Sequence, residues 1–160
     1  PAILCRGAHA DLFPIDIGMA RDTKVPRYKV AYGTKNMAKG PAMTREEAVR
    51  ALETGIAVAE EKIAAGYQLM ATGEMGIGNT TTSSAMAAVF LNQPVPELTG
   101  RGAGLSSEGL ARKIAAIEKA IAINQPDPSD PIDVLAKVGG FDIAAWRVSF
   151  LQGLHMAFRL

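Results

Sequence analysis

The chain has 160 residues, which is the usual length of one domain. Its 17 basic and 16 acidic side chains give a net charge of +1, which argues against a nucleic-acid partner. Cys5 is the only cysteine, so an internal disulfide is excluded, and no apolar run reaches the roughly 20 residues of a membrane helix. We therefore expect a cytoplasmic protein with no membrane partner. Because the chain starts at Pro1 and ends in a half-apolar segment, we also expect a piece of a longer protein.

The first part of the chain predicts a strand, a long loop and a helix. Residues 10–18 are typical of a short buried strand, and the polar, aperiodic residues 18–42 predict a long loop of the kind that is often functional. Thr44 and Glu47 have the spacing of a capping box, so a helix should begin after Thr44. Gly66 suits its end. Its apolar stripe consists of Ala48, Leu52, Ile56, Ala59 and Ile63.

The middle of the chain predicts a second strand over residues 67–72, a glycine-rich turn and a helix over about residues 80–91. A loop with prolines and glycines follows. Ser106 or Ser107 can then cap another helix that runs to about Asn124. The apolar stripe of that helix consists of Leu110, Ile114, Ile117 and Ile121.

The last part of the chain predicts two more helices. Asp130 as N-cap and Pro131 at the first helical position introduce a short helix over about residues 132–137, which a glycine pair ends. An apolar tail from Phe141 suits one further helix. Two strands among these helices predict an α/β layout with parallel strands, although two strands are too few for a sheet covered on both faces.

The glycine-rich turn between the second strand and its helix is the first candidate site. Gly73, Gly76 and Gly78 match neither the Walker loop nor the Rossmann dinucleotide spacing. Amide groups at such a turn and helix start favour an anionic ligand, and the carboxylate of Glu74 suggests chemistry beyond phosphate binding. A purely structural tight turn is the alternative.

A second glycine cluster precedes the helix that begins near Ser106. Gly100, Gly102 and Gly104 supply a flexible backbone, and Lys113 follows two helical turns later. A backbone nest together with a lysine suits a phosphate group. A flexible loop and a solvated surface lysine are the alternative.

Other candidate side chains carry weaker signals. His9 and His155 are far apart, and neither has Cys or His at metal-ligand spacing, so we expect no metal site and no cofactor. Asp16, at the end of the first predicted strand, could hold a ligand hydroxyl or cap a local turn.

At the glycine-rich turn the sequence resembles the nicotinate-nucleotide:dimethylbenzimidazole phosphoribosyltransferase family, which acts in the lower-ligand branch of cobalamin synthesis. The run that carries the resemblance is Gly73-Glu74-Met75-Gly76-Ile77-Gly78-Asn79-Thr80-Thr81. Further family motifs occur in the same order, from about Ala10 to Ala144. They are Ile15-Asp16-Ile17-Gly18, Gly33-Thr34-Lys35-Asn36, Gly40-Pro41-Ala42-Met43-Thr44, Gly102-Ala103-Gly104-Leu105 and Gly139-Gly140-Phe141-Asp142-Ile143-Ala144.

The resemblance implies an α/β, Rossmann-like three-layer fold with a mostly parallel sheet, incomplete in this chain, and a homodimer. It implies transfer of ribose 5-phosphate from nicotinate mononucleotide to 5,6-dimethylbenzimidazole without a metal, giving α-ribazole 5′-phosphate and nicotinate. Glu74 would be an auxiliary catalytic group beside the ribose, where a carboxylate stabilises positive charge at the anomeric carbon. The substrate-binding residues that it implies are Gly76, Gly78, Asn79, Thr80, Thr81, Gly102, Gly104 and Lys113.

The sequence also departs from the family. Family members are roughly twice as long, and their principal catalytic glutamate lies in a segment beyond Leu160. We therefore expect reduced or no transfer activity from this chain. The alternatives are a non-catalytic fragment that self-associates through unpaired strand edges and open apolar faces, and a generic nucleotide-binding module.

The tail differs most from the family pattern. We expect residues 1–144 to form a partial phosphoribosyltransferase domain, and residues 145–160 to be an atypical helical tail. Read one base out of frame, with permissible codon choices, the tail becomes family-like. We hypothesise that it arises from a frameshift, which resequencing the gene would test.

Overall fold

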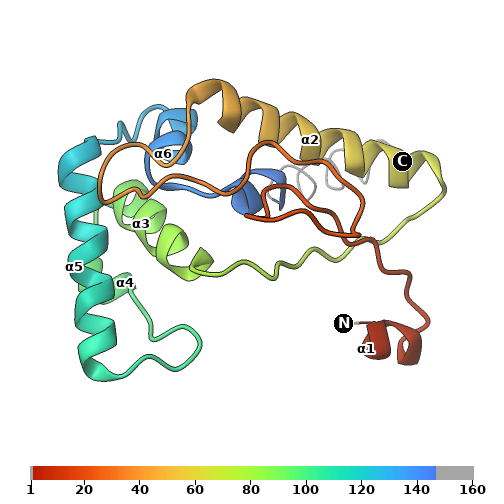
Figure 1. Cartoon of the computed structure of the whole chain (residues 1–160), viewed down its shortest axis with the longest axis horizontal. Helices are drawn as coiled ribbons and strands as arrows, with labels where there is room; N and C mark the ends of the chain where they lie inside the picture. The colour runs from red at the N-terminus through yellow and green to blue at the C-terminus, as the bar shows by residue number, and fades with distance from the viewer. Residues whose placement is uncertain (1, 147–160) are drawn as a thin grey trace.

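The structure, a computed structural model, describes residues 2–146 and is helical wherever it is regular (Figure 1). The expected atypical tail falls almost entirely outside the described residues. No helix in the described part is long and apolar enough to cross a membrane. The helices are α1 (Ala2–Gly7), α2 (Arg45–Ala64), α3 (Asn79–Leu91), α4 (Val95–Leu98), α5 (Ser107–Asn124) and α6 (Pro131–Val138), and residues 141–146 are also helical.

Local capping determines where the long helices begin. Thr44 Oγ1 accepts a hydrogen bond from Glu47 N at 3.1 Å, and the Glu47 carboxylate accepts one from Thr44 N at 2.8 Å. Ser106 caps α5 by accepting from Gly109 N, and Asp130 caps α6. These contacts confirm the predicted starts of α2, α5 and α6, because each cap satisfies N–H groups that have no acceptor within the helix.

Neither predicted strand forms a ladder in residues 2–146. Residues 10–18 contain only an isolated parallel bridge between Asp16 and Arg27, and residues 67–72 have no regular structure, although the Tyr67 hydroxyl donates to Asp11. A parallel sheet needs neighbouring strands on both sides and helices on both faces. The mostly parallel sheet expected from the resemblance is therefore not seen in this part of the chain. The short helices α1 and α4 were not predicted; α1 has no buried residue and lies apart from the other helices (Figure 1).

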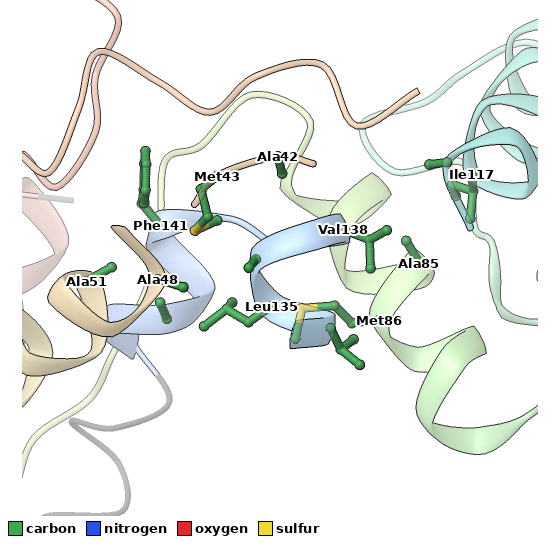
Figure 2. Close-up of a cluster of buried hydrophobic side chains, with 14 of the residues drawn as sticks. Ala42, Met43, Ala48, Ala51, Ala85, Met86, Ile117, Leu135, Val138 and Phe141 are labelled. Carbon is green, nitrogen blue, oxygen red and sulfur yellow. The ribbon is translucent and has the colours of Figure 1, made fainter. Parts of the chain in front are cut away.

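The hydrophobic core is centred on α6, which packs against α2, α3 and α5. Figure 2 shows Leu135 and Val138 of α6 between alanines of α2 on one side and Ala85 and Met86 of α3 on the other. Ile117, Val134 and Val138 are the largest fully buried apolar side chains. A core built largely from small side chains brings the helix backbones close together, and it holds the first residues of α3 in a fixed position.

The buried face of α2 contains Ala48 and Ala59 of the predicted apolar stripe but not its larger side chains. Leu52, Ile56 and Ile63 are only partly buried. A Cβ atom at Gly55 would collide with the backbone of Ala145, so the terminal helical segment lies directly against the α2 backbone. Small residues therefore form the closest contact. The buried residues of α2 are Ala48, Ala51, Gly55 and Ala59.

The predicted long loop has no regular structure, but buried polar contacts hold it in place. Asp16 Oδ2 and Lys29 Nζ form an ion pair at 2.8 Å, with side chains only 2% and 3% exposed. Asp16 Oδ1 also accepts from Met19 N, and Lys29 Nζ donates to Met19 O. Burial by itself would raise the pKa of Asp16, but its contacts with Lys29 and Met19 N outweigh burial and hold that pKa below its usual value. Asp16 therefore caps a local turn.

Candidate functional site

The two glycine-rich segments of the chain meet at the start of α3. Gly78 is the N-cap, its φ of 87° lies in the left-handed region, and no side chain caps the helix. The first N–H groups of a helix have no acceptor within it and carry partial positive charge. Gly78 thus leaves the start of α3 available to an anionic group, as the sequence predicts for this turn.

Lys113 reaches this helix start from the neighbouring helix α5. Its Nζ donates to Thr80 Oγ1 at 2.9 Å and to Gly100 O at 3.0 Å, and the residue is only 8% exposed. Among residues 2–146, no carboxylate lies within ion-pair distance of that nitrogen. An ammonium group has three donors, so one remains after these two contacts. Lys113 is therefore a buried cation whose hydrogen-bond partners in residues 2–146 are neutral.

Gly102 permits the loop before α5 to approach this cation. Its φ is +58°, and a Cβ atom there would lie 3.0 Å from Thr80 Oγ1 and 3.7 Å from Lys113 Nζ. A side chain at this position would be strained and would crowd both groups. Gly104 also has a positive φ, of +100°, but lies in open space. Of the predicted phosphate residues, the structure thus brings Gly102 and Lys113 together with Thr80, and Gly104 only shares their loop.

Two carboxyl groups lie on the other side of the α3 start. Glu74 Oε2 accepts a hydrogen bond from Gly76 N. A Cβ atom at Gly76 would lie 3.0 Å from Glu74 Oε2, 3.2 Å from Asp142 Oδ2 and 3.5 Å from Asn79 Cβ. The predicted residues Glu74, Gly76 and Asn79 therefore lie together, and Asp142 joins them from the terminal helical segment.

Asp142 was not predicted as a site residue. Its Oδ2 atom is buried and has no hydrogen-bond partner among the described residues. Burial raises the pKa of Asp142 and, together with the negative charge of Glu74, outweighs the backbone N–H groups of Ile143 and Asp142, which lower it. The only sequence signal was its position within a family motif, directly after the glycine pair that ends α6. Its proximity to Glu74 depends on the packing of segments almost 70 residues apart.

The remaining predicted residues form the helix start itself. Thr81 N donates to Gly78 O at 2.8 Å and closes the first turn. Asn79 adjoins the carboxyl groups, and Thr80, the next residue, adjoins Lys113. The site therefore has an acidic end beside Asn79 and a basic end beside Thr80, and these two residues are adjacent in the sequence. A nucleotide has a similar polarity, because its phosphate is anionic and its sugar hydroxyls donate hydrogen bonds.

Other features of the described residues lie outside this site. A hollow of about 420 Å³ is lined by Lys35, Asn36, Lys39, Gly40, Pro41, Met43 and Thr44, none of which was predicted as a site residue. Residues 2–146 contain no group of three His, Cys, Asp or Glu side chains that could hold a metal ion. The α3 start brings the buried cation of Lys113 and the carboxyl groups of Glu74 and Asp142 next to glycines that approach them closely.

Comparison with known proteins identifies the family. A family profile described as phosphoribosyltransferase matches residues 2–156. The nicotinate-nucleotide–dimethylbenzimidazole phosphoribosyltransferase of Ruminiclostridium cellulolyticum is 52% identical over 152 residues, which are 93% of this chain and 43% of that protein. The enzyme of the same name from Alkaliphilus metalliredigens is 58% identical over 137 residues, which are 83% of this chain and 39% of that protein.

The similarity extends to three dimensions. A crystal structure of CobT from Thermus thermophilus matches 96% of this chain and 47% of its own length, with a TM-score of 0.88 and 39% identity. This chain thus spans less than half the length of the curated relatives and of the solved structure that it matches. The sequence profile and the superposition agree, and the chain belongs to the nicotinate-nucleotide–dimethylbenzimidazole phosphoribosyltransferase family.

Proposed function

We propose that the start of α3 binds nicotinate mononucleotide in the transfer of ribose 5-phosphate to 5,6-dimethylbenzimidazole. The names of the relatives support this reaction, and the polarity of the site suits the nucleotide. The products are α-ribazole 5′-phosphate and nicotinate, and we place the reaction in the cytoplasm. This chain covers 43% of its relative in R. cellulolyticum, so we assign nucleotide binding to this chain and propose the transfer reaction for the whole protein.

The observation that carries this proposal is the buried ammonium group of Lys113, whose hydrogen-bond partners among the described residues are neutral. A buried cation is costly unless an anion compensates it. The phosphate of the nucleotide would accept the remaining N–H of Lys113 and would lie beside Gly102 and the N–H groups at the start of α3. Fixed donors of this kind hold the sugar in one position while its bond to the base breaks.

The acidic end of the site suits the chemistry at the anomeric carbon. When the bond to the nicotinate nitrogen breaks, its electron pair leaves with nicotinate and the sugar becomes positively charged. A benzimidazole nitrogen then forms the new bond to that carbon, and a base removes the proton from the other nitrogen. With the phosphate at Lys113, Glu74 would lie beside the sugar, where a carboxylate stabilises positive charge. We assign it this auxiliary role, since the family resemblance implies a principal base in another segment.

Titration calorimetry with nicotinate mononucleotide tests the binding claim. We expect Lys113→Gln to weaken binding roughly 10-fold to 100-fold, since a hydrogen bond to a charged group contributes about 1.5–3 kcal/mol. Lys119→Gln is the matched control, because Lys119 is exposed on the same helix. Absence of wild-type binding at millimolar concentration would refute the proposal. Equal affinity for adenosine monophosphate would favour a generic nucleotide-binding module instead.

A second candidate property is self-association, and one feature favours it. Leu69, Met75 and Ile77 are 90%, 88% and 106% exposed in the extended segment between α2 and α3. Extended backbone with exposed apolar side chains pairs readily with another chain. We therefore propose that the chain forms homo-oligomers, as the family resemblance implies. Light scattering tests this, and a stable monomer at high concentration would contradict it.

A further inference from the structure

We propose that Asp142 is a specificity-determining residue whose Oδ2 atom accepts a hydrogen bond from a ribose hydroxyl of the bound nucleotide. The site would thereby select a ribonucleotide over its deoxy forms. This inference rests on the proposed binding of nicotinate mononucleotide at the start of α3 and assigns a role to a side chain outside the predicted site.

The position of Asp142 is defined by two glycines. A Cβ atom at Gly140 would collide with Asp142 Oδ1, and one at Gly76 would lie 3.2 Å from Asp142 Oδ2. The carboxyl group thus lies between two backbones that approach it closely because they carry no side chains. Its Oδ2 atom is directed to the same point near Gly76 as Glu74 Oε2. Asp142 is therefore held toward the proposed sugar position.

The Oδ2 atom has no partner within the described residues. It is buried and accepts no hydrogen bond in residues 2–146. Most buried polar atoms of folded proteins have such a partner, and an exception calls for an explanation. A donor supplied by a ligand would complete the site.

The chemistry of the nucleotide identifies that donor. An ionised carboxylate only accepts hydrogen bonds, so its partner must carry a hydrogen. In nicotinate mononucleotide the phosphate and the carboxylate are acceptors, and the pyridinium nitrogen is bonded to the sugar. The two ribose hydroxyls are therefore the principal donors of the ligand. With the phosphate at Lys113, beside Thr80, the sugar would extend toward Asn79 and the two carboxyl groups.

A structural role for Asp142 is the competing explanation. An acidic residue in the first turn of a helix interacts favourably with the helix dipole, and Asp142 follows Phe141, where the terminal helical segment begins. The two explanations differ in their effect on stability. Burial together with Glu74 raises the pKa of Asp142 and outweighs the hydrogen bonds from the backbone N–H groups of Ile143 and of Asp142 itself, which favour the ionised carboxylate, so ionisation costs stability as pH rises through the folded pKa. The neutral variant Asp142→Asn should then be more stable, whereas loss of a structural carboxylate would lower stability.

The test measures binding of three ligands, nicotinate mononucleotide and its 2′-deoxy and 3′-deoxy forms, to the wild type and to Asp142→Asn. We expect the wild type to bind one deoxy form at least about tenfold more weakly than the parent nucleotide. Asp142→Asn should lose a similar factor for the parent and little for that deoxy form, because the partner hydroxyl is already absent. Glu118→Gln is the control for the lost charge, since Glu118 is exposed on α5.

Each outcome bears on a different claim. Selective loss of the hydroxyl-dependent affinity, with an unchanged or raised melting temperature, supports the role of Asp142. Equal losses for all three nucleotides, or no loss, would overturn it while leaving nucleotide binding intact. Failure of the wild type to bind any of the three would refute the proposed function as well.

Discussion

Two regions of this molecule bury charged groups, and they do so in opposite ways. In the loop after residue 15, Asp16 and Lys29 neutralise each other at 2.8 Å and use the backbone around Met19 for their other contacts. At the start of α3, Lys113 has only neutral partners and Asp142 Oδ2 has none among the described residues. Paired buried charges stabilise a loop, whereas unpaired ones are a usual feature of binding sites.

The largest expected effect is on the paired region. Lys29→Met would leave Asp16 buried without its cation, and we expect a loss of about 3–5 kcal/mol in the free energy of unfolding. Urea denaturation measures this loss. Lys24→Met is the matched control, because Lys24 is exposed in the same loop. A loss near zero for Lys29→Met would show that the ion pair does not support the loop.

At the start of α3, by contrast, we expect a substitution to change stability little and ligand binding strongly. Lys113→Met leaves acceptors on Thr80 and Gly100, which are exposed to water, so we expect stability to change by less than about 1 kcal/mol. The variant should lose its stabilisation by ligand. Nicotinate mononucleotide at 100 times its dissociation constant stabilises a binding protein by about 2.7 kcal/mol. Thermal unfolding with and without the nucleotide measures both effects, and equal ligand stabilisation of variant and wild type would contradict the assignment.

Alanine substitutions at two glycines with positive φ distinguish an effect of backbone strain from an effect on nucleotide binding. Gly102 and Gly66 have φ values of +58° and +94°, so alanine at either position should destabilise the fold by roughly 1–2 kcal/mol. Only Gly102 lies against Thr80 and Lys113; the Cα of Gly66 faces open space. We therefore expect Gly102→Ala to weaken nucleotide binding and Gly66→Ala to leave it unchanged. Calorimetry measures the nucleotide affinity of both variants, after each is shown to be folded. Weaker binding by Gly66→Ala as well would show that backbone strain alone causes the loss of affinity.

The opposite pKa shifts of Asp16 and Asp142 predict opposite pH dependences of the free energy of unfolding. The pKa of Asp16 is lowered in the folded protein, so its contribution is present above the ordinary value of about 4 and is lost as pH falls through the folded value. The pKa of Asp142 is raised, so stability falls as pH rises from about 4 through its folded value. Either slope is limited to about 1.4 kcal/mol per pH unit. Denaturation across pH 2–7 should show Asp142→Asn removing the second slope only.

The starts of several helices follow from local sequence, but the pairing of strands does not. The starts at Thr44, Ser106 and Asp130 were predictable because a cap involves residues within three positions of each other. The strands over residues 10–18 and 67–72 were predicted from composition, yet a strand exists only when another segment pairs with it. The buried face of α2 was predicted only in part, at Ala48 and Ala59, because Ala145, about 90 residues away, determines the contact at Gly55.

The candidate site likewise combines features that follow from local sequence with features that depend on tertiary packing. The sequence by itself determined the glycine-rich turn, the position of Glu74 in it and the start of a helix near Thr80, because turn and helix signals act over a few residues. Tertiary structure decided that Lys113 is buried against Thr80, and that Asp142 faces Gly76 beside Glu74. Burial and the distance between charges depend on how distant segments pack, and it is these quantities that turn an ordinary lysine or aspartate into a binding group.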